Sequence, residues 1–304
     1  PVLKIASISK QEFLRCTDVL LSLELVDECF NVVKISDQCF ADFLLNYVFF
    51  EKKYIKVKDL IVYTYKYYKK RIIESINSIL NTCFSDDSFL YFKNEVLDSC
   101  SLVEDIGLKH DIEVTFANLI LDNAALEFKK GVEDVNYEKD IDWLLGLFQV
   151  LAKSKYQLVA NDGIIYLLKK TQAKKENVIK AINETYSLDF YCVKSSFEYL
   201  DFFVSYLIEH EIYEEYFLTL VSSYLKYSFE NGEFVSGKKI EVYSFRLSDD
   251  MDRIIAFRAK CWKFIFSYDG DAPLSIIVDF ARNHIIDCAQ KIVKCDLEVI
   301  NKYL

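Results

Sequence analysis

The sequence predicts an all-α protein with one short extended or hairpin segment near 233–247. Apolar residues recur at spacings of three and four along most of the chain, which is the period of an amphipathic α-helix. The 304 residues include only 7 Gly and 2 Pro, too few for the turns and phosphate loops of most sheet and nucleotide-binding α/β proteins. Alternation with a period of two, which is typical of a strand, is found at 233–247.

The clearest helical pattern covers 54–83, and the neighbouring elements are interpreted around it. No Gly or Pro interrupts this stretch, so we expect one continuous helix that buries an apolar stripe. The stripe consists of Val57, Ile61, Tyr65, Tyr68, Ile72, Ile76, Ile79 and Cys83.

Three helices are expected before 54–83. Ser9 and Glu12 have the spacing of a capping box, which predicts a helix over about 10–24. A short helix is expected at 26–33. Ser36 then precedes a further apolar stripe, which predicts a helix over 37–51.

The pattern continues to the C-terminal end. Gly131 is expected to end a helix in the left-handed conformation, and Gly237 to turn the hairpin. We expect helices over 85–100, 111–130, 137–153, 162–170, 176–186, 193–210, 213–229 and 249–267, with one or two more across 273–303.

About a dozen helices joined by short polar links favour a stacked array over a globular bundle, because each helix pair must cover its apolar face. Tetratricopeptide and ankyrin motifs are absent. An irregular HEAT- or armadillo-like α-solenoid therefore remains, with a large helical bundle as the alternative. We expect a single array over 1–304, with a soft subdivision near 131–136 or 231–248, cut from a longer protein.

The cysteines and the apolar runs indicate a cellular location. Nine Cys are scattered without close pairs, mostly on expected apolar helix faces, which is typical of free buried thiols in a reducing compartment. No apolar run reaches the roughly 18–20 residues of a membrane span, and no secretory signal is recognisable. We therefore expect an intracellular protein of the cytoplasm or nucleus, with no membrane partner.

Catalytic motifs are lacking in the sequence, so we expect no enzyme, no cofactor and no metal site. Phosphate-cradling glycine loops, a nucleophile elbow and H-E-x-x-H are all absent. His284, Cys288 and Cys295 share one helix face, but Cys295 lies roughly 10 Å beyond Cys288 along the axis and could not complete a zinc site. The aspartates at 249–252 and 269–271 are more simply a helix start and a turn.

The best candidate for a binding surface is the basic stretch. Residues 51–71 carry eight basic and two acidic side chains, net +6, in a chain of net charge −10. Lys66, Lys69, Lys70 and Arg71 are interleaved with tyrosines, and such surfaces bind acidic or phosphorylated peptides or a single nucleic-acid strand. An ordinary solvated helix face is the plainer interpretation.

We therefore expect a non-enzymatic protein–protein interaction scaffold that binds a partner protein or peptide in a groove, with Lys66, Lys69, Lys70 and Arg71 as partner-binding residues. The alternative is a nucleic-acid- or phosphate-binding protein that uses the basic residues 52–71. The net charge of −16 on the rest of the chain makes nucleic acid the weaker alternative.

Overall fold

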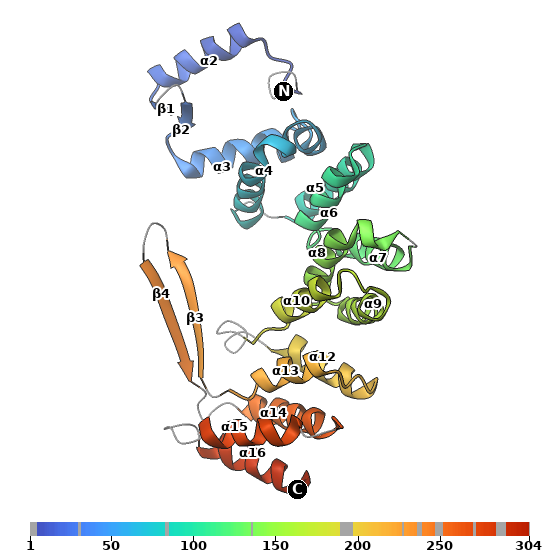
Figure 1. Cartoon of the computed structure of the whole chain (residues 1–304). Coiled ribbons are helices and arrows are strands. Elements are labelled where there is room, and N and C mark those ends of the chain that lie inside the picture. The colour runs from blue at the N-terminus through green and yellow to red at the C-terminus, as the bar shows by residue number, and fades with distance from the viewer. Residues whose placement is uncertain are drawn as a thin grey trace. The chain divides into compact units, whose positions relative to one another are not determined.

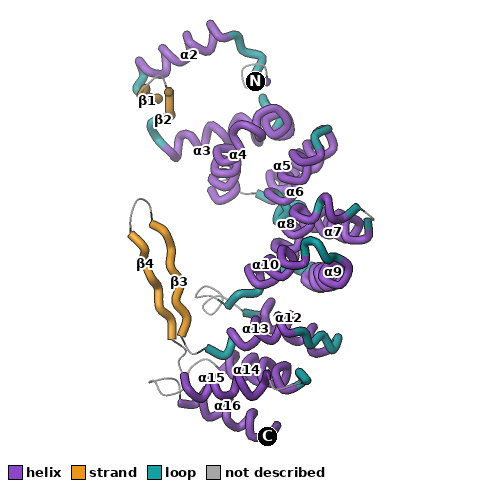
Figure 2. Tube along the Cα trace, viewed as in Figure 1, coloured by secondary structure: helices purple, strands orange, loops and turns teal. Residues whose placement is uncertain are grey.

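The structure is a computed structural model. It describes residues 5–29, 32–82, 85–134, 136–188, 197–226, 228–235, 239–246, 252–269, 272–283 and 290–303. Within these ranges the chain is predominantly helical, with fourteen α-helices, a π-helix, a 3-10 helix and two antiparallel hairpins (Figures 1 and 2). The predicted all-α class is confirmed.

The chain divides into two compact units, 1–124 and 125–304, and the division falls inside α7 (Leu121–Glu133). The soft subdivisions expected near 131–136 and 231–248 stay predictions. The first unit contains α2 (Lys10–Ser22), β1 (Val26–Cys29), β2 (Val32–Ile35), α3 (Gln38–Asn46), η1 (Tyr47–Glu51), α4 (Val57–Thr82), α5 (Asp86–Leu102) and α6 (Ile106–Thr115).

The expected helix starts at Ser9 and Ser85 are confirmed. The Ser9 hydroxyl accepts the amide of Glu12 at 3.2 Å, and the Glu12 carboxylate accepts the amide of Ser9 at 2.9 Å, which completes the capping box. Ser85 accepts the amide of Ser88 at 3.2 Å and starts α5 in the same way.

Residues 26–29 and 32–35 form two paired antiparallel strands, so the helix predicted over 26–33 is wrong. Val26 pairs with Ile35, and Cys29 pairs with Val32. The β-branched residues favour extended backbone, and a stretch this short makes an unstable helix, because the first helical turn is costly to nucleate. The expectation that strands occur only near 233–247 is wrong for the same reason.

Helix α4 supplies much of the core of the first unit. Its stripe residues from Val57 to Ile79, other than Tyr68, are buried in one core cluster with Phe92 and Val96 of α5 and with Phe116, the residue that follows α6. Tyr68 has non-helical backbone dihedrals, φ −131° and ψ 25°, and is 53% exposed. The expectation of an unbroken helix is therefore wrong at Tyr68, where neither Gly nor Pro signals the kink. Cys83 lies outside the described residues.

The second unit contains, after α7, η2 (Tyr137–Lys139), α8 (Ile141–Leu151), α9 (Gln157–Lys170), α10 (Lys175–Thr185), α12 (Glu198–Glu209), α13 (Glu215–Ser223), β3 (Ser228–Val235), β4 (Lys239–Arg246), α14 (Asp252–Phe266), α15 (Ala272–Asn283) and α16 (Gln290–Tyr303). Helix contacts follow the chain: α8, α9 and α10 pack together, α12 packs on α9 and α14, and α14 packs on α13 and α16.

The boundaries of α6 and α7 differ from the predictions. The helix expected over 111–130 is broken between Thr115 and Leu121, and Gly131 lies inside α7 and does not end a helix. A Cβ atom on Gly131 would lie 2.6 Å from Leu144 Cδ2 and 2.9 Å from Trp143 Cζ3. Gly131 therefore allows α7 to approach α8 closely.

The helix expected over 213–229 ends earlier, because β3 begins at Ser228. The hairpin predicted near 233–247 is present: Ser228 pairs with Arg246 and Val235 with Lys239. The carbonyls of Tyr224, Leu225 and Lys226, which follow α13, accept hydrogen bonds from Arg258 at 3.3, 2.9 and 3.2 Å. Arg258 thus satisfies the backbone where the helix stops. Gly237 lies outside the described residues.

The cysteines are less buried than predicted. Cys100 and Cys261 are buried and Cys295 is half-buried, but Cys16, Cys29 and Cys39 are exposed. These three lie on α2, β1 and α3. In α2 the cause is plain, since that helix has no buried residue. Cys83, Cys192 and Cys288 lie outside the described residues.

Candidate functional site

The basic and aromatic side chains expected to bind a partner lie together on the solvent side of α4. Tyr63, Tyr67 and Tyr68 are 59%, 70% and 53% exposed. The side chains of Lys70 and Arg71 are 89% and 84% exposed. Tyr63, Lys66, Tyr67 and Lys70 follow helical spacing, so they share one face, opposite the buried residues Ile61 and Tyr65. We call Tyr63, Lys66, Tyr67, Tyr68, Lys70 and Arg71 the α4 face.

Each of the four expected binding residues also lies near a carboxylate. Lys69 Nζ is 2.6 Å from Asp111 Oδ1, and Lys66 Nζ is 4.0 Å from Asp105 Oδ2. Lys70 and Arg71 both lie 3.8 Å from Glu74, on the next turn of α4. Four cations therefore meet three carboxylates, and the local excess of positive charge is smaller than the sequence indicates.

Lys69 differs from its neighbours because its ammonium forms a short ion pair with Asp111 of α6. Burial favours its neutral form, but the hydrogen bond to Asp111 and the nearby charges outweigh this and raise the pKa of Lys69. The Tyr65 hydroxyl, on the turn before Lys69, pairs with Thr115 Oγ1 at 2.7 Å. Lys69 thus holds α4 to α6, whereas Lys66, Lys70 and Arg71 remain available to a partner.

Two lysines that come earlier in the basic stretch, Lys53 and Lys58, contact side chains of α5 near the start of α4. Lys58 donates its amide to the buried Glu95 at 3.1 Å and its ammonium to Asp98 at 2.8 Å, and the latter bond raises the pKa of Lys58. Lys53 lies over the ring of Tyr91, 4.2 Å from its centroid. The stretch 52–71 is therefore not one continuous basic surface.

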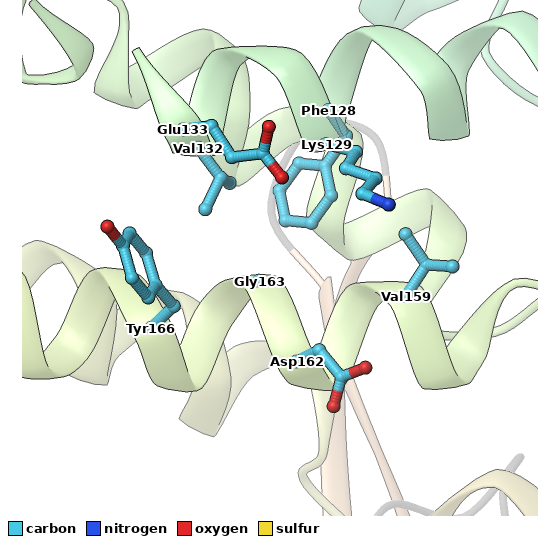
Figure 3. Close-up of a pocket in the computed structure, with 8 residues that line it drawn as sticks. All are labelled: Phe128, Lys129, Val132, Glu133, Val159, Asp162, Gly163 and Tyr166. Carbon is cyan, nitrogen blue, oxygen red and sulfur yellow. The ribbon is translucent and has the colours of Figure 1, made fainter. Parts of the chain in front are cut away.

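A second feature, which the sequence did not indicate, is a pocket between α7 and α9 with a volume of about 320 Å³ (Figure 3). Gly163 makes room for it: a Cβ atom there would lie 2.4 Å from Cε1 of Phe128. A glycine in the middle of an apolar helical run is the signal that could have indicated such a close approach. The lining residues are Phe128, Lys129, Val132, Glu133, Val159, Asp162, Gly163 and Tyr166.

The pocket is apolar inside and charged at its edge. Phe128 and Val132 are buried, whereas Lys129, Glu133 and Asp162 are exposed. In Figure 3 the Glu133 carboxylate points toward the Phe128 ring and the Asp162 carboxylate points away from it. Asp162 Oδ1 accepts the Tyr206 hydroxyl at 2.7 Å, so a hydrogen bond to α12 fixes this carboxylate at the edge of the pocket. The size and lining suit one apolar side chain or a small ligand.

No three or more His, Cys, Asp or Glu side chains within the described ranges are grouped so that they could hold a metal ion. His284, Cys288, Asp249, Asp250 and Asp271 lie outside these ranges. In the described part of the chain, no helix has the length and hydrophobicity that a bilayer crossing needs.

Comparison of the chain with protein-family models, with curated proteins and with solved structures finds no match.

Proposed function

We propose that the protein is a non-enzymatic protein–protein interaction scaffold, built as an irregular α-solenoid, and that the α4 face binds an acidic or phosphorylated segment of a partner protein. The observation that carries this proposal is the exposure of three tyrosines beside Lys70 and Arg71. Tyrosine and arginine are enriched among the residues that dominate binding energy, because they combine large apolar area with directed polar groups.

The remaining features are compatible with this function. Contacts that follow the chain through α8, α9, α12, α14 and α16 suit an array that presents a long surface. The exposed free thiols Cys16, Cys29 and Cys39 suit a reducing intracellular compartment. The pocket between α7 and α9 offers a second place for an apolar anchor of a bound segment.

The second candidate is a protein that binds nucleic acid or phosphate through the same face. The exposed guanidinium of Arg71 next to Tyr67 and Tyr68 favours it, since bases stack on aromatic rings and phosphates pair with arginine. The three carboxylates at this surface and the net charge of −10 weaken it, because they repel a polyanion.

The test compares the wild type with the triple variant Lys66→Glu, Lys70→Glu, Arg71→Glu in pull-downs from native extract. Lys69 stays, because its pair with Asp111 supports the fold. The control variant reverses Lys263, Lys294 and Lys302, exposed lysines of α14 and α16, and so makes the same change in charge. We expect the α4 variant alone to lose partners, with the thermal unfolding of all three proteins nearly equal. Identical partner sets would refute the proposal.

The nucleic-acid candidate is tested separately with a labelled single-stranded oligonucleotide across a salt series. Affinity that falls steeply with salt and disappears in the α4 variant would support nucleic-acid binding. No binding at low salt would exclude it.

A further inference from the structure

The pocket between α7 and α9 carries opposite charges at two separate places on its edge. In Figure 3 the Lys129 ammonium points away from Glu133, toward the side that Val159 lines. The Glu133 carboxylate points toward the Phe128 ring, and Tyr166 lines the side opposite Val159. The pocket therefore has an acidic, aromatic part, formed by Phe128, Glu133 and Tyr166, and a basic, aliphatic part.

The charges at this edge are available to a ligand. Lys129 and Glu133 are four residues apart on α7, a spacing at which ion pairs form on a helix. Neither of them is in an ion pair within the part of the chain that the structure describes. Asp162 accepts the neutral hydroxyl of Tyr206. Two carboxylates and one ammonium thus line the pocket, which gives its lining a net charge of −1.

We propose that this pocket binds a small organic cation with an apolar body, with its positive charge beside the Glu133 carboxylate and the rings of Phe128 and Tyr166. A cation is attracted both by a carboxylate and by the face of an aromatic ring. The Tyr166 ring already attracts one cation within the fold, since Lys170 Nζ, which does not line the pocket, is 5.2 Å from its centroid. The apolar body would contact Val132.

A cation finds more partners in this pocket than an anion does. The lining side chains offer an anion the Lys129 ammonium and the Tyr166 hydroxyl, and this hydroxyl points away from the other lining side chains in Figure 3. A cation finds two carboxylates and two aromatic rings. The volume of about 320 Å³ lies at the lower end of the range of small-molecule sites, so we expect a ligand of modest size.

The test measures the binding of benzyltrimethylammonium to the full chain by ligand-observed NMR. Benzyl alcohol and phenylacetate, which share its ring, serve as the neutral and anionic probes. We expect the cation to bind most tightly of the three, with a dissociation constant on the order of 1 mM. Phenylacetate that binds as tightly as the cation, or no binding of the cation up to about 10 mM, would overturn the proposal.

Charge variants at the pocket should shift this affinity in opposite directions. Glu133→Gln should weaken binding of the cation about threefold to fivefold, because it removes the adjacent carboxylate. Lys129→Gln should strengthen it by up to about threefold, because it removes a like charge. The control is Glu176→Gln, which makes the same change of charge at an exposed position of α10 outside the pocket and should bind as the wild type does. An unchanged affinity in Glu133→Gln, or a weakened one in Lys129→Gln, would refute the proposed placement of the cation.

Two further measurements test the ring and the source of the cation. Tyr166→Leu keeps an apolar side chain but removes the ring, and should weaken binding about twofold to fivefold, whereas equal affinity would contradict the role of the ring. N-acetyl-trimethyllysine methylamide presents a quaternary ammonium on a protein side chain. If it binds more tightly than benzyltrimethylammonium, the site belongs to a lysine of a partner and the small-molecule assignment is overturned.

The outcome is separate from that of the proposed scaffold function. The pocket lies in the unit 125–304 and the α4 face in the unit 1–124, and the probes report on the pocket alone. Thermal unfolding of each variant checks that it is folded, and little change is expected because Lys129, Glu133, Tyr166 and Glu176 are all exposed.

Discussion

Arg258 and Asp296 form a fully buried, bidentate ion pair that joins α14 to α16. Arg258 Nη2 lies 2.7 Å from Asp296 Oδ2, and Arg258 Nε lies 3.0 and 3.2 Å from the two carboxylate oxygens. The indole of Trp262 donates to Asp296 Oδ1 at 3.1 Å. Since Arg258 also donates to the three carbonyls that follow α13, one side chain connects α14, α16 and the segment between α13 and β3.

Removing one member of this pair should be costly, because it leaves the other charge buried without its partner. We expect Asp296→Ala to lower the free energy of unfolding by about 3–5 kcal/mol. The control is Asp201→Ala, which removes an ion pair of similar length, 2.6 Å between Asp201 and Lys260. The side chains of Asp201 and Lys260 are 35% and 41% exposed. That change should cost about 1 kcal/mol or less. Urea unfolding measures both, and equal losses would contradict the distinction.

The close approach of α9 to Phe128 makes Gly163 intolerant of a side chain. Gly163→Ala would place a methyl 2.4 Å from the Phe128 ring, so the two helices must separate, at a cost of about 1–3 kcal/mol. Gly107→Ala is the matched control: its nearest atom, Asp105 Oδ1, would be 3.5 Å away, and alanine should stabilise α6 by up to about 1 kcal/mol. Opposite signs in thermal unfolding are expected, and a stabilising Gly163→Ala would show that the pocket is not held by this contact.

The free cysteines should separate into two reactivity classes. Burial, assisted by Glu113, raises the pKa of Cys100 to about 12, and burial raises the pKa of Cys261 as well. Both thiols are therefore protonated and inaccessible at pH 8, while Cys16, Cys29 and Cys39 are exposed. A short iodoacetamide pulse followed by peptide mass spectrometry should label these three before Cys100 and Cys261. Labelling of Cys100 or Cys261 should require denaturant, and labelling at similar rates without it would refute their burial.

The sequence predicts the helical elements well where a long apolar stripe decides the structure. The stripe of α4 and the capping box at Ser9 follow from spacing alone. Periodicity fails at 26–35, where two four-residue strands complete each other's hydrogen bonds, and at Tyr68, where the helix is kinked. Both outcomes depend on partners that a local pattern does not contain.

Helical spacing predicts which cations lie together on α4, but it does not predict which carboxylates lie beside them. Lys66, Lys69, Lys70 and Arg71 fall where helical geometry places them, but Asp105 and Asp111 approach from α6, about forty residues along the chain. The pocket at Gly163 and the pair Arg258–Asp296 depend on contacts between elements distant in sequence. A glycine inside a helix indicates that another element can approach closely, but no local pattern identifies Phe128 as the neighbour of Gly163 or Asp296 as the partner of Arg258.

Buried tyrosines should make the fold sensitive to alkali. Burial raises the pKa of Tyr91 to about 12, with Glu95 adding to the effect, and burial also raises the pKa of Tyr186, Tyr206 and Tyr216. Unfolded tyrosines ionise near pH 10, so above that pH the unfolded chain holds fewer protons than the folded one, and stability falls as pH rises. This contribution is intact below about pH 10 and is lost progressively up to the folded pKa.

Urea midpoints measured between pH 8 and 11 should therefore decline above about pH 10, and absorbance at 295 nm should show part of the tyrosine ionisation accompanying unfolding. Tyr91→Phe should reduce the slope of this decline, because it removes one ionising group from the unfolded state. Tyr63→Phe changes an exposed ring and is the control. A slope that Tyr91→Phe leaves unchanged would mean that the Tyr91 hydroxyl ionises equally in the folded and unfolded states, contrary to its burial between α4 and α5.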